Sequence, residues 1–314
     1  ISLGLEISGY ALALAGKSIT VQAQLDFISD ERITLGNATI EENGHFHLDF
    51  PSTGLSPDIH VFYLRSGNLE GVFYGNKDGQ YEIEIPSLDK NIPQKFDQSE
   101  IPIIWKKGSD ATHILALRFY KILDQFVDEH YYDFAVEKFQ GHEEQRVRLK
   151  NESSDMVPKA TVSRDSLHLE SFRHIVDQFG DTVMQKNQIE FDQNEFLKLL
   201  KTYSIARLKI VAGYPKTQLI DLYFNSNSIY IAHPTYIETS ELFFDNIYHE
   251  GPDSFVKKIQ SQIKAFRLDS LNLSLDKVSF LPSAAAREMS MLLFLKSERA
   301  KNKLSVTDYY QWLD

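Results

Sequence analysis

The sequence contains no cysteine among its 314 residues, and it lacks the short motifs by which many enzymes are recognised. Without cysteine the chain forms no disulfide, offers no thiolate nucleophile and binds no metal ion through a cysteine thiolate. A phosphate-binding loop, a G-x-S-x-G elbow and an H-E-x-x-H helix are also missing. No single residue therefore identifies a reaction.

Basic residues are in the minority, and long apolar runs are absent. The net charge of −11 disfavours binding to the phosphate backbone of nucleic acid, so we expect no nucleic-acid partner. No apolar run approaches the roughly 18 residues of a membrane span. No signal peptide is visible, but the chain starts without methionine inside a strand-like pattern. We therefore expect that a leader segment precedes Ile1.

The composition is that of a globular protein, with 42% hydrophobic and 25% charged residues. The acidic residues are unevenly distributed. Residues 1–105 hold six Lys or Arg against fifteen Asp or Glu, whereas the rest of the chain is close to balance. Together with the length, this asymmetry favours two units with different surfaces.

The first part of the chain alternates between apolar and polar residues, which is typical of half-buried strands. This pattern predicts strands over 1–7, 19–27, 46–50, 58–65, 69–74 and 81–85, with turns at Asn43-Gly44 and 76–79. Short strands separated by turns predict an antiparallel β-sandwich over residues 1–87. With no crossover helices between the strands, we expect every pair to be antiparallel.

Beyond the strands, the pattern changes to helical spacing. Residues 88–108, with Pro93 and Pro102, are interpreted as a linker, and 109–314 as a mainly helical domain, which gives an α+β fold. An N-cap is predicted at Ser109-Asp110. One apolar stripe of the first helix is predicted to hold Ile114, Leu117, Ile122 and Phe126. Further helices are predicted over 131–150, 165–186, 192–212, 253–268, 282–300 and 306–313.

The stretch from Ile229 to Tyr248 joins an extended apolar segment to an aromatic helix. Pro234 suits the first helical position, and a residue before proline favours extended geometry, which fits His233. We interpret His233 as a structural histidine at the helix entry. Phe243 and Phe244 are expected in the core, and Gly251-Pro252 is expected to end the helix.

Several polar clusters are candidates for binding sites. His45, His47 and Asp49 alternate on one strand face and could ligate zinc, but no fourth ligand is evident, so a solvated face is expected. Glu82 and Glu84 are interpreted in the same way. The acidic residues Asp26, Asp30, Glu31, Glu41 and Glu42 could bind calcium, but they form no EF-hand loop. We assign no catalytic, cofactor-binding or metal-binding residue, and expect no cofactor.

Two further groups have ordinary structural interpretations. The aromatic runs His130-Tyr131-Tyr132 and 309–312 could stack on sugars or partners, but core packing is the commoner role. A charged helix face is the interpretation given to Ser166, His168, Arg173 and His174. No catalytic triad is assigned to them, because a triad is defined by its arrangement in space.

Three segments carry a family resemblance: GKSITVQAQLDFISDERITLGNATIEENGHFHLDF, HPTYIETSELFFDNIY and LPSAAAREMSMLLFLKS. In this order they resemble the N-terminal, non-catalytic region of thioredoxin-like, TlpA/ResA-type envelope proteins of the Bacteroidetes. The resemblance implies export to the periplasm or the outer membrane, often as a lipoprotein whose lipidated cysteine would lie upstream of Ile1. Such proteins continue into a thioredoxin domain with Cys-x-x-Cys, which this chain lacks.

The expected function is therefore that of a non-catalytic accessory or interaction region of a cell-envelope protein. Its partner would be another protein or an adjoining thioredoxin domain. Two alternatives remain open: a binding module for a glycan or other nutrient ligand, and a hydrolase with an unrecognised site.

Overall fold

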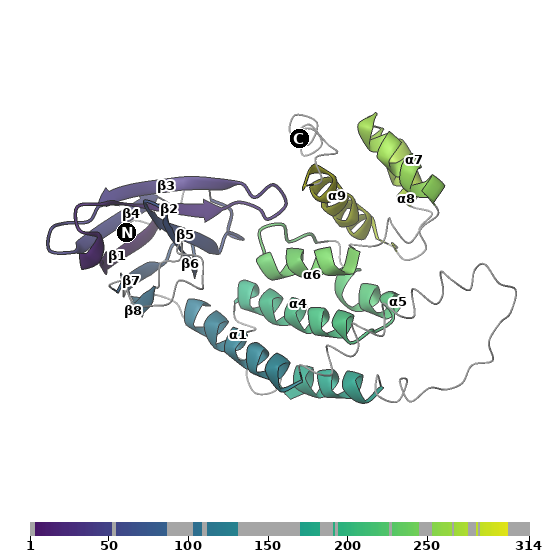
Figure 1. The fold of residues 1–314 in the computed structure, drawn as a ribbon, viewed down its shortest axis with the longest axis horizontal. Helices are drawn as coiled ribbons and strands as arrows, with labels where there is room; N and C mark the ends of the chain where they lie inside the picture. The colour runs from purple at the N-terminus through teal and green to yellow at the C-terminus, as the bar shows by residue number, and fades with distance from the viewer. Residues whose placement is uncertain are drawn as a thin grey trace, which may run out of the picture. The chain divides into compact units, whose positions relative to one another are not determined.

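The computed structural model describes residues 4–51, 55–86, 103–108, 112–130, 170–182, 191, 194–225, 228–244, 253–265, 267–275, 281 and 283–300. The fold is α+β, with strands in the N-terminal part and helices in the remainder (Figure 1). None of the described helices is long and apolar enough to cross a membrane. The chain divides into two compact units, which are described separately below.

The N-terminal strands form two four-stranded sheets, in the orders β4-β1-β7-β8 and β3-β2-β5-β6. A short 3-10 helix, Leu12–Leu14, follows the first strand. The strands are β1 (Gly4–Tyr10), β2 (Ser18–Gln24), β3 (Arg32–Thr39), β4 (His45–Pro51), β5 (Val61–Ser66), β6 (Leu69–Tyr74), β7 (Gln80–Glu84) and β8 (Ile104–Gly108). The predicted sandwich is therefore confirmed.

Alternation along the strands builds the core of this sandwich. In β4, Phe46, Leu48 and Phe50 are buried, while the residues between them are exposed. The apolar faces of both sheets meet in one cluster, which includes Leu5, Ile7, Ile19, Val21, Phe62, Leu64, Phe73, Tyr81 and Ile83. Burial of such side chains is the main favourable contribution to folding, about 1.5–3 kcal/mol for each large one.

The sheets differ from the sequence prediction in three ways. β1 pairs with β7 in parallel, because the long intervening chain supplies the crossover. β3 was not predicted: it is an edge strand of partly buried residues, and a register shift against β2 interrupts its pattern. β8 lies in the interval interpreted as a linker and pairs with β7.

The first unit extends past the predicted sandwich. It comprises Ile1–Phe119, Asn194–Leu197 and Ile231–Pro234. Ring contacts explain the extension: Trp105 lies 4.7 Å from His113 between ring centroids, and Tyr74 lies 5.8 Å from His113. The Tyr74 main-chain N–H also donates to His113 Nδ1 at 3.2 Å.

The stripe predicted for α1 (Thr112–Glu129) is wrong at Ile114 and Leu117, whereas Phe126 is buried as predicted. Ile114 is 57% exposed and Leu117 is 50% exposed, whereas Ala116, Phe119 and Phe126 are buried. The buried face begins with the polar residue Thr112, which a search for apolar residues passes over. At 100° per residue, Ile114 and Leu117 lie on the opposite side of the helix.

The remaining helices largely follow the predicted spacing. Residues 170–182 are helical, within the predicted 165–186. The others are α4 (Glu195–Val211), α5 (Lys216–Leu219), a π-helical turn (Ile220–Phe224), α6 (Pro234–Phe244), α7 (Asp253–Lys264), α8 (Leu268–Leu275) and α9 (Ala284–Ala300). Gly213, with φ 67°, follows α4 as predicted, since that conformation favours glycine. The helices predicted over 131–150 and 306–313 lie outside the described residues.

The aromatic helix α6 begins at Pro234, as its sequence indicates. Phe243 and Phe244 are both buried, and Phe243 stacks on Phe224 with 4.7 Å between ring centroids. Residues 231–232 form a turn where an extended segment was expected, although the Ile231 carbonyl accepts a hydrogen bond from Phe27 N at 2.8 Å. Residues 245–250 and Gly251-Pro252 lie outside the described part.

Candidate functional site

His45, His47 and Asp49 lie on the outer face of the sheet β4-β1-β7-β8, as alternation predicts. His47 Nδ1 is 3.9 Å from a carboxylate oxygen of Glu6 on the neighbouring strand, and both side chains are largely exposed. Over the described ranges, no group of three His, Asp or Glu side chains is arranged to hold a metal ion. His45, His47 and Asp49 therefore present their polar groups to solvent and form no metal site within the described ranges.

The acidic residues near the end of β2 serve the loop that carries them. Asp26 Oδ1 accepts hydrogen bonds from the main-chain N–H groups of Ile28 at 2.7 Å and Ser29 at 2.5 Å. Its second oxygen accepts from the Ser29 hydroxyl. Asp26 therefore closes an Asx turn between β2 and β3, and both of its oxygens are engaged.

His233 is buried within the first unit, with 4% of its surface exposed. Its Nε2 donates to the Phe196 carbonyl oxygen at 3.0 Å. Burial lowers the pKa of His233 to about 4, because the charged imidazolium is poorly solvated there; the Phe196 carbonyl opposes this effect and His60 adds to it. A histidine that stays neutral at physiological pH and is fixed to the backbone fits the structural interpretation.

Arg173 lies in the second unit and fastens the helix 170–182 to the end of α4. Its Nε donates to the Ala212 carbonyl at 3.2 Å, and its Nη2 donates to the Gly213 carbonyl. Lys209 pairs with Asp177 at 2.7 Å. Burial alone would raise the pKa of Asp177, but the hydrogen bond and charge of Lys209 lower it. A general acid needs the opposite shift, so this cluster stabilises the helix end instead.

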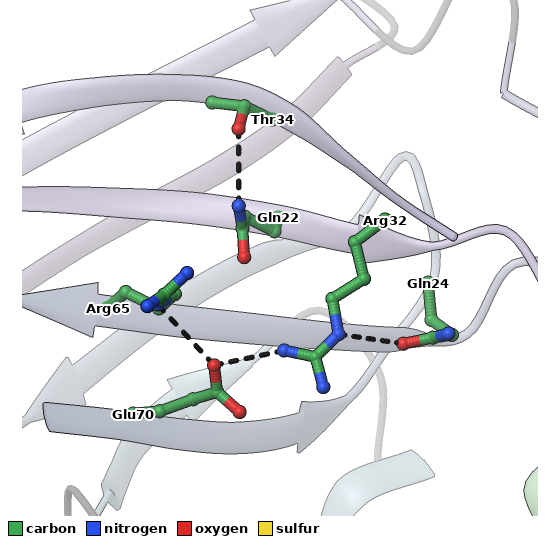
Figure 2. Close-up of polar contacts among 6 residues, drawn as sticks. All are labelled: Gln22, Gln24, Arg32, Thr34, Arg65 and Glu70. Carbon is green, nitrogen blue, oxygen red and sulfur yellow. Dashed lines mark hydrogen bonds and ion pairs between the residues drawn. The ribbon is translucent and has the colours of Figure 1, made fainter. Parts of the chain in front are cut away.

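The most organised polar array lies on the outer face of the sheet β3-β2-β5-β6 (Figure 2). The Arg32 guanidinium lies 3.5 Å from the centroid of the Tyr63 ring, and its Nη1 is 2.9 Å from Glu70 Oε2. Its Nε donates to Gln24 Oε1 at 3.0 Å. Arg65 Nε lies 3.5 Å from the same Glu70 oxygen. We call Arg32, Tyr63, Arg65 and Glu70 the arginine face.

Strand register creates the arginine face. Arg65 is paired with Glu70 between β5 and β6, and Gln22 with Tyr63 between β2 and β5. Gln22 Nε2 donates to the Thr34 hydroxyl at 3.3 Å, while its buried Oε1 has no hydrogen-bond partner among the described residues. These side chains are therefore held in place before any partner arrives, and Arg65 remains about half exposed.

Tyr63 is not a free platform for a ligand. It is 7% exposed and lies beneath Arg32, and burial raises the pKa of its phenol although Arg32 lowers it. Sequence reasoning did not find the arginine face, because its residues come from strands far apart in the chain and β3 was not predicted.

Hollows are also present elsewhere among the described residues. On the outer face of the sheet β4-β1-β7-β8, a hollow of about 410 Å³ is lined by residues that include Tyr10, His45, Glu84 and Lys106. In the second unit, a groove of about 500 Å³ has apolar lining from Phe244, Leu293 and Phe294. Two ion pairs, Arg207–Glu238 at 3.0 Å and Lys296–Glu241 at 2.9 Å, also border that groove.

Several predicted candidates fall outside the described part: Ser166, His168, Tyr131, Tyr132 and residues 309–312. His130 is described, and its ring lies 4.8 Å from that of Phe126 on the same helix. No protein-family model matches the chain, and no curated protein matches it.

Proposed function

We propose that this chain is a non-catalytic accessory region of an exported, thioredoxin-like envelope protein of the TlpA/ResA type. It acts in the periplasm or at the outer membrane, with attachment through a lipidated cysteine upstream of Ile1. Its role is to dock a partner protein, or to present an adjoining thioredoxin domain to that partner. The resemblance of three sequence segments supports the proposed family, and the chemistry of the surface supports the proposed docking role.

The observation that carries the docking role is the arginine face. Arginine is enriched at the centres of protein interfaces, where fixed side chains lose little entropy on binding. Here Arg32 is held by Gln24, Glu70 and the Tyr63 ring, so much of its ordering cost is met during folding. Arg65 is held at one nitrogen and half exposed, which leaves donors for a partner.

The test is co-isolation from envelope extracts of the organism that makes the protein, followed by calorimetry with the purified partner. We expect one protein to be recovered with the tagged chain and lost with Arg32→Ala/Arg65→Ala. Arg207→Ala is the matched control, because it removes an exposed arginine from an ion pair in the other unit. Equal recovery of the partner with the parent chain, the double variant and Arg207→Ala would contradict the proposal. The comparison requires that both variants keep the parent's circular dichroism spectrum.

A glycan-binding role is the second candidate, and the hollow beside Tyr10 favours it. Tyr10 meets His45 edge to face at 5.3 Å, and Glu84 pairs with Lys106 at 2.5 Å beside the same hollow. An exposed aromatic ring next to charged groups suits a sugar. Binding on a glycan array that is lost with Tyr10→Ala, and kept with Arg65→Ala, would select this role.

A further inference from the structure

The outer edge of β6 has main-chain groups that no described strand uses. Among the described strands, β6 pairs only with β5 and stands at the end of its sheet. The hairpin that joins them turns at Gly67, whose φ of 60° favours glycine, and brings Ser66 opposite Leu69. Edge strands expose such groups unless something covers them.

The direction of the unpaired groups follows from Tyr74. Its N–H donates to His113 Nδ1 at 3.2 Å, so at this residue the hydrogen-bonding groups point away from β5. In an antiparallel ladder this direction alternates, which places the N–H and C=O of Val72 and Glu70 on the same outer side. Across the described ranges, neither residue has a hydrogen bond on that side. His113 thus occupies one position of the edge, and the next positions are open.

The other three edge strands carry protective features that β6 lacks. β8 has Lys106 and Lys107 and a register shift against β7. β4 ends in Pro51 and presents His45, His47 and Asp49 outward. β3 has a register shift against β2. Charges, proline and bulges are the features that prevent strand addition.

β6 has no lysine, no proline and no bulge in its sequence LEGVFY. Its charged residue, Glu70, is engaged by Arg32 and Arg65 of its own sheet. Val72 is 43% exposed at the middle of the strand and lies opposite Tyr63. The edge is therefore short, free of register shifts and apolar at its centre.

We propose that β6 receives a short extended segment of a partner protein by strand addition, with a β-branched or apolar residue beside Val72. This inference rests on the docking role proposed above and specifies how the partner binds. Main-chain hydrogen bonds at Glu70 and Val72 supply affinity, and the neighbouring arginine face supplies selectivity. His113 limits the open edge to a few residues, so a contact between two copies here would bury far less than the roughly 1,200 Å² of a stable interface.

The experiment uses the full chain and a phage-displayed library of random dodecapeptides as the probe. We expect selected peptides to alternate β-branched or apolar residues with polar ones, and to protect the Val72 amide from hydrogen exchange. Val72→Pro removes the outward N–H without touching the ladder to β5, and Val72→Lys adds an edge charge. Each variant is expected to raise the Kd of the peptide about tenfold or more. A change of this size corresponds to the loss of roughly one charged or two neutral hydrogen bonds. Val72→Thr keeps a β-branched residue and is expected to bind like the parent.

Four results would overturn the inference, the fourth being the comparison of variants given last. The first is failure to select any peptide. The second is binding that is indifferent to both Val72→Pro and Val72→Lys. The third is concentration-dependent self-association that Val72→Lys abolishes, which would make a second copy the occupant. If Val72→Lys leaves co-isolation of the native partner unchanged while Arg32→Ala/Arg65→Ala removes it, the edge inference fails and the proposed function stands.

Discussion

His233 donates a hydrogen bond from Nε2 to the main-chain carbonyl of Phe196 at 3.0 Å, and their rings lie 4.7 Å apart. The two residues are 37 positions apart in the sequence, and both belong to the first unit. A histidine at the start of α6 thus fastens the beginning of α4, because a buried imidazole needs a partner for its N–H. The same ring of Phe196 lies 5.2 Å from Tyr74 and 5.3 Å from His60.

This arrangement predicts a pH-dependent stability. The pKa of His233 is about 4 in the folded chain, against an ordinary value of 6.5. Between these two values the unfolded chain binds a proton that the folded chain does not, so the free energy of unfolding falls as the pH decreases from 6.5 to 4. The loss is about 3 kcal/mol in total, and this residue adds no further dependence below pH 4 or above 6.5.

Urea denaturation at several pH values between 7.5 and 3.5 measures this dependence. The control is His233→Gln, which keeps an N–H donor for the Phe196 carbonyl but does not titrate in this range. Between pH 6.5 and 4, the free energy of unfolding of the parent should fall relative to that of the variant as the pH decreases. Parallel curves for the two proteins would show that His233 is not responsible.

Phe243 and Phe244 are predicted to be essential for the stability of the second unit. Both are buried, and they meet each other edge to face at 4.9 Å. Replacing either with alanine should cost about 3–5 kcal/mol, because the cavity is not refilled. Leu242 on the same helix is an exposed control, and Leu242→Ala should change stability by no more than about 0.5 kcal/mol. Thermal unfolding followed by circular dichroism separates these outcomes.

The orientation of α1 gives a paired test. Phe119 is buried and Ile114 is exposed, so Phe119→Ala should destabilise by about 3–5 kcal/mol. Ile114→Ala should stay within about 0.5 kcal/mol of the parent. The reverse order would restore the apolar stripe predicted from the sequence and overturn the packing of this helix.

Sequence periodicity predicted the sandwich and most helices, because the buried face of each strand or helix requires apolar residues at a regular spacing. It failed where burial is partial, as in β3, and where a polar residue takes part in the buried face, as Thr112 does in α1. The parallel pairing of β1 with β7 depends on a crossover that spans many residues, which local patterns do not encode.

The arginine face shows the same limit for a site. Arg32 and Glu70 are 38 residues apart, and only the pairing of β2, β3, β5 and β6 brings them together. No local spacing in the sequence marks them as neighbours. The position of His233 at a helix entry could be predicted from the sequence, because the dipeptide His233-Pro234 marks the start of α6.

The proposed docking role gives this chain no thiol–disulfide chemistry of its own. Disulfide exchange requires a thiolate that attacks sulfur, and the chain has no cysteine. The most direct measurement is insulin reduction by dithiothreitol, with and without the purified chain. We predict that insulin precipitates at the rate set by dithiothreitol alone at every protein concentration. Acceleration that follows the protein through purification and increases with its concentration would contradict the account.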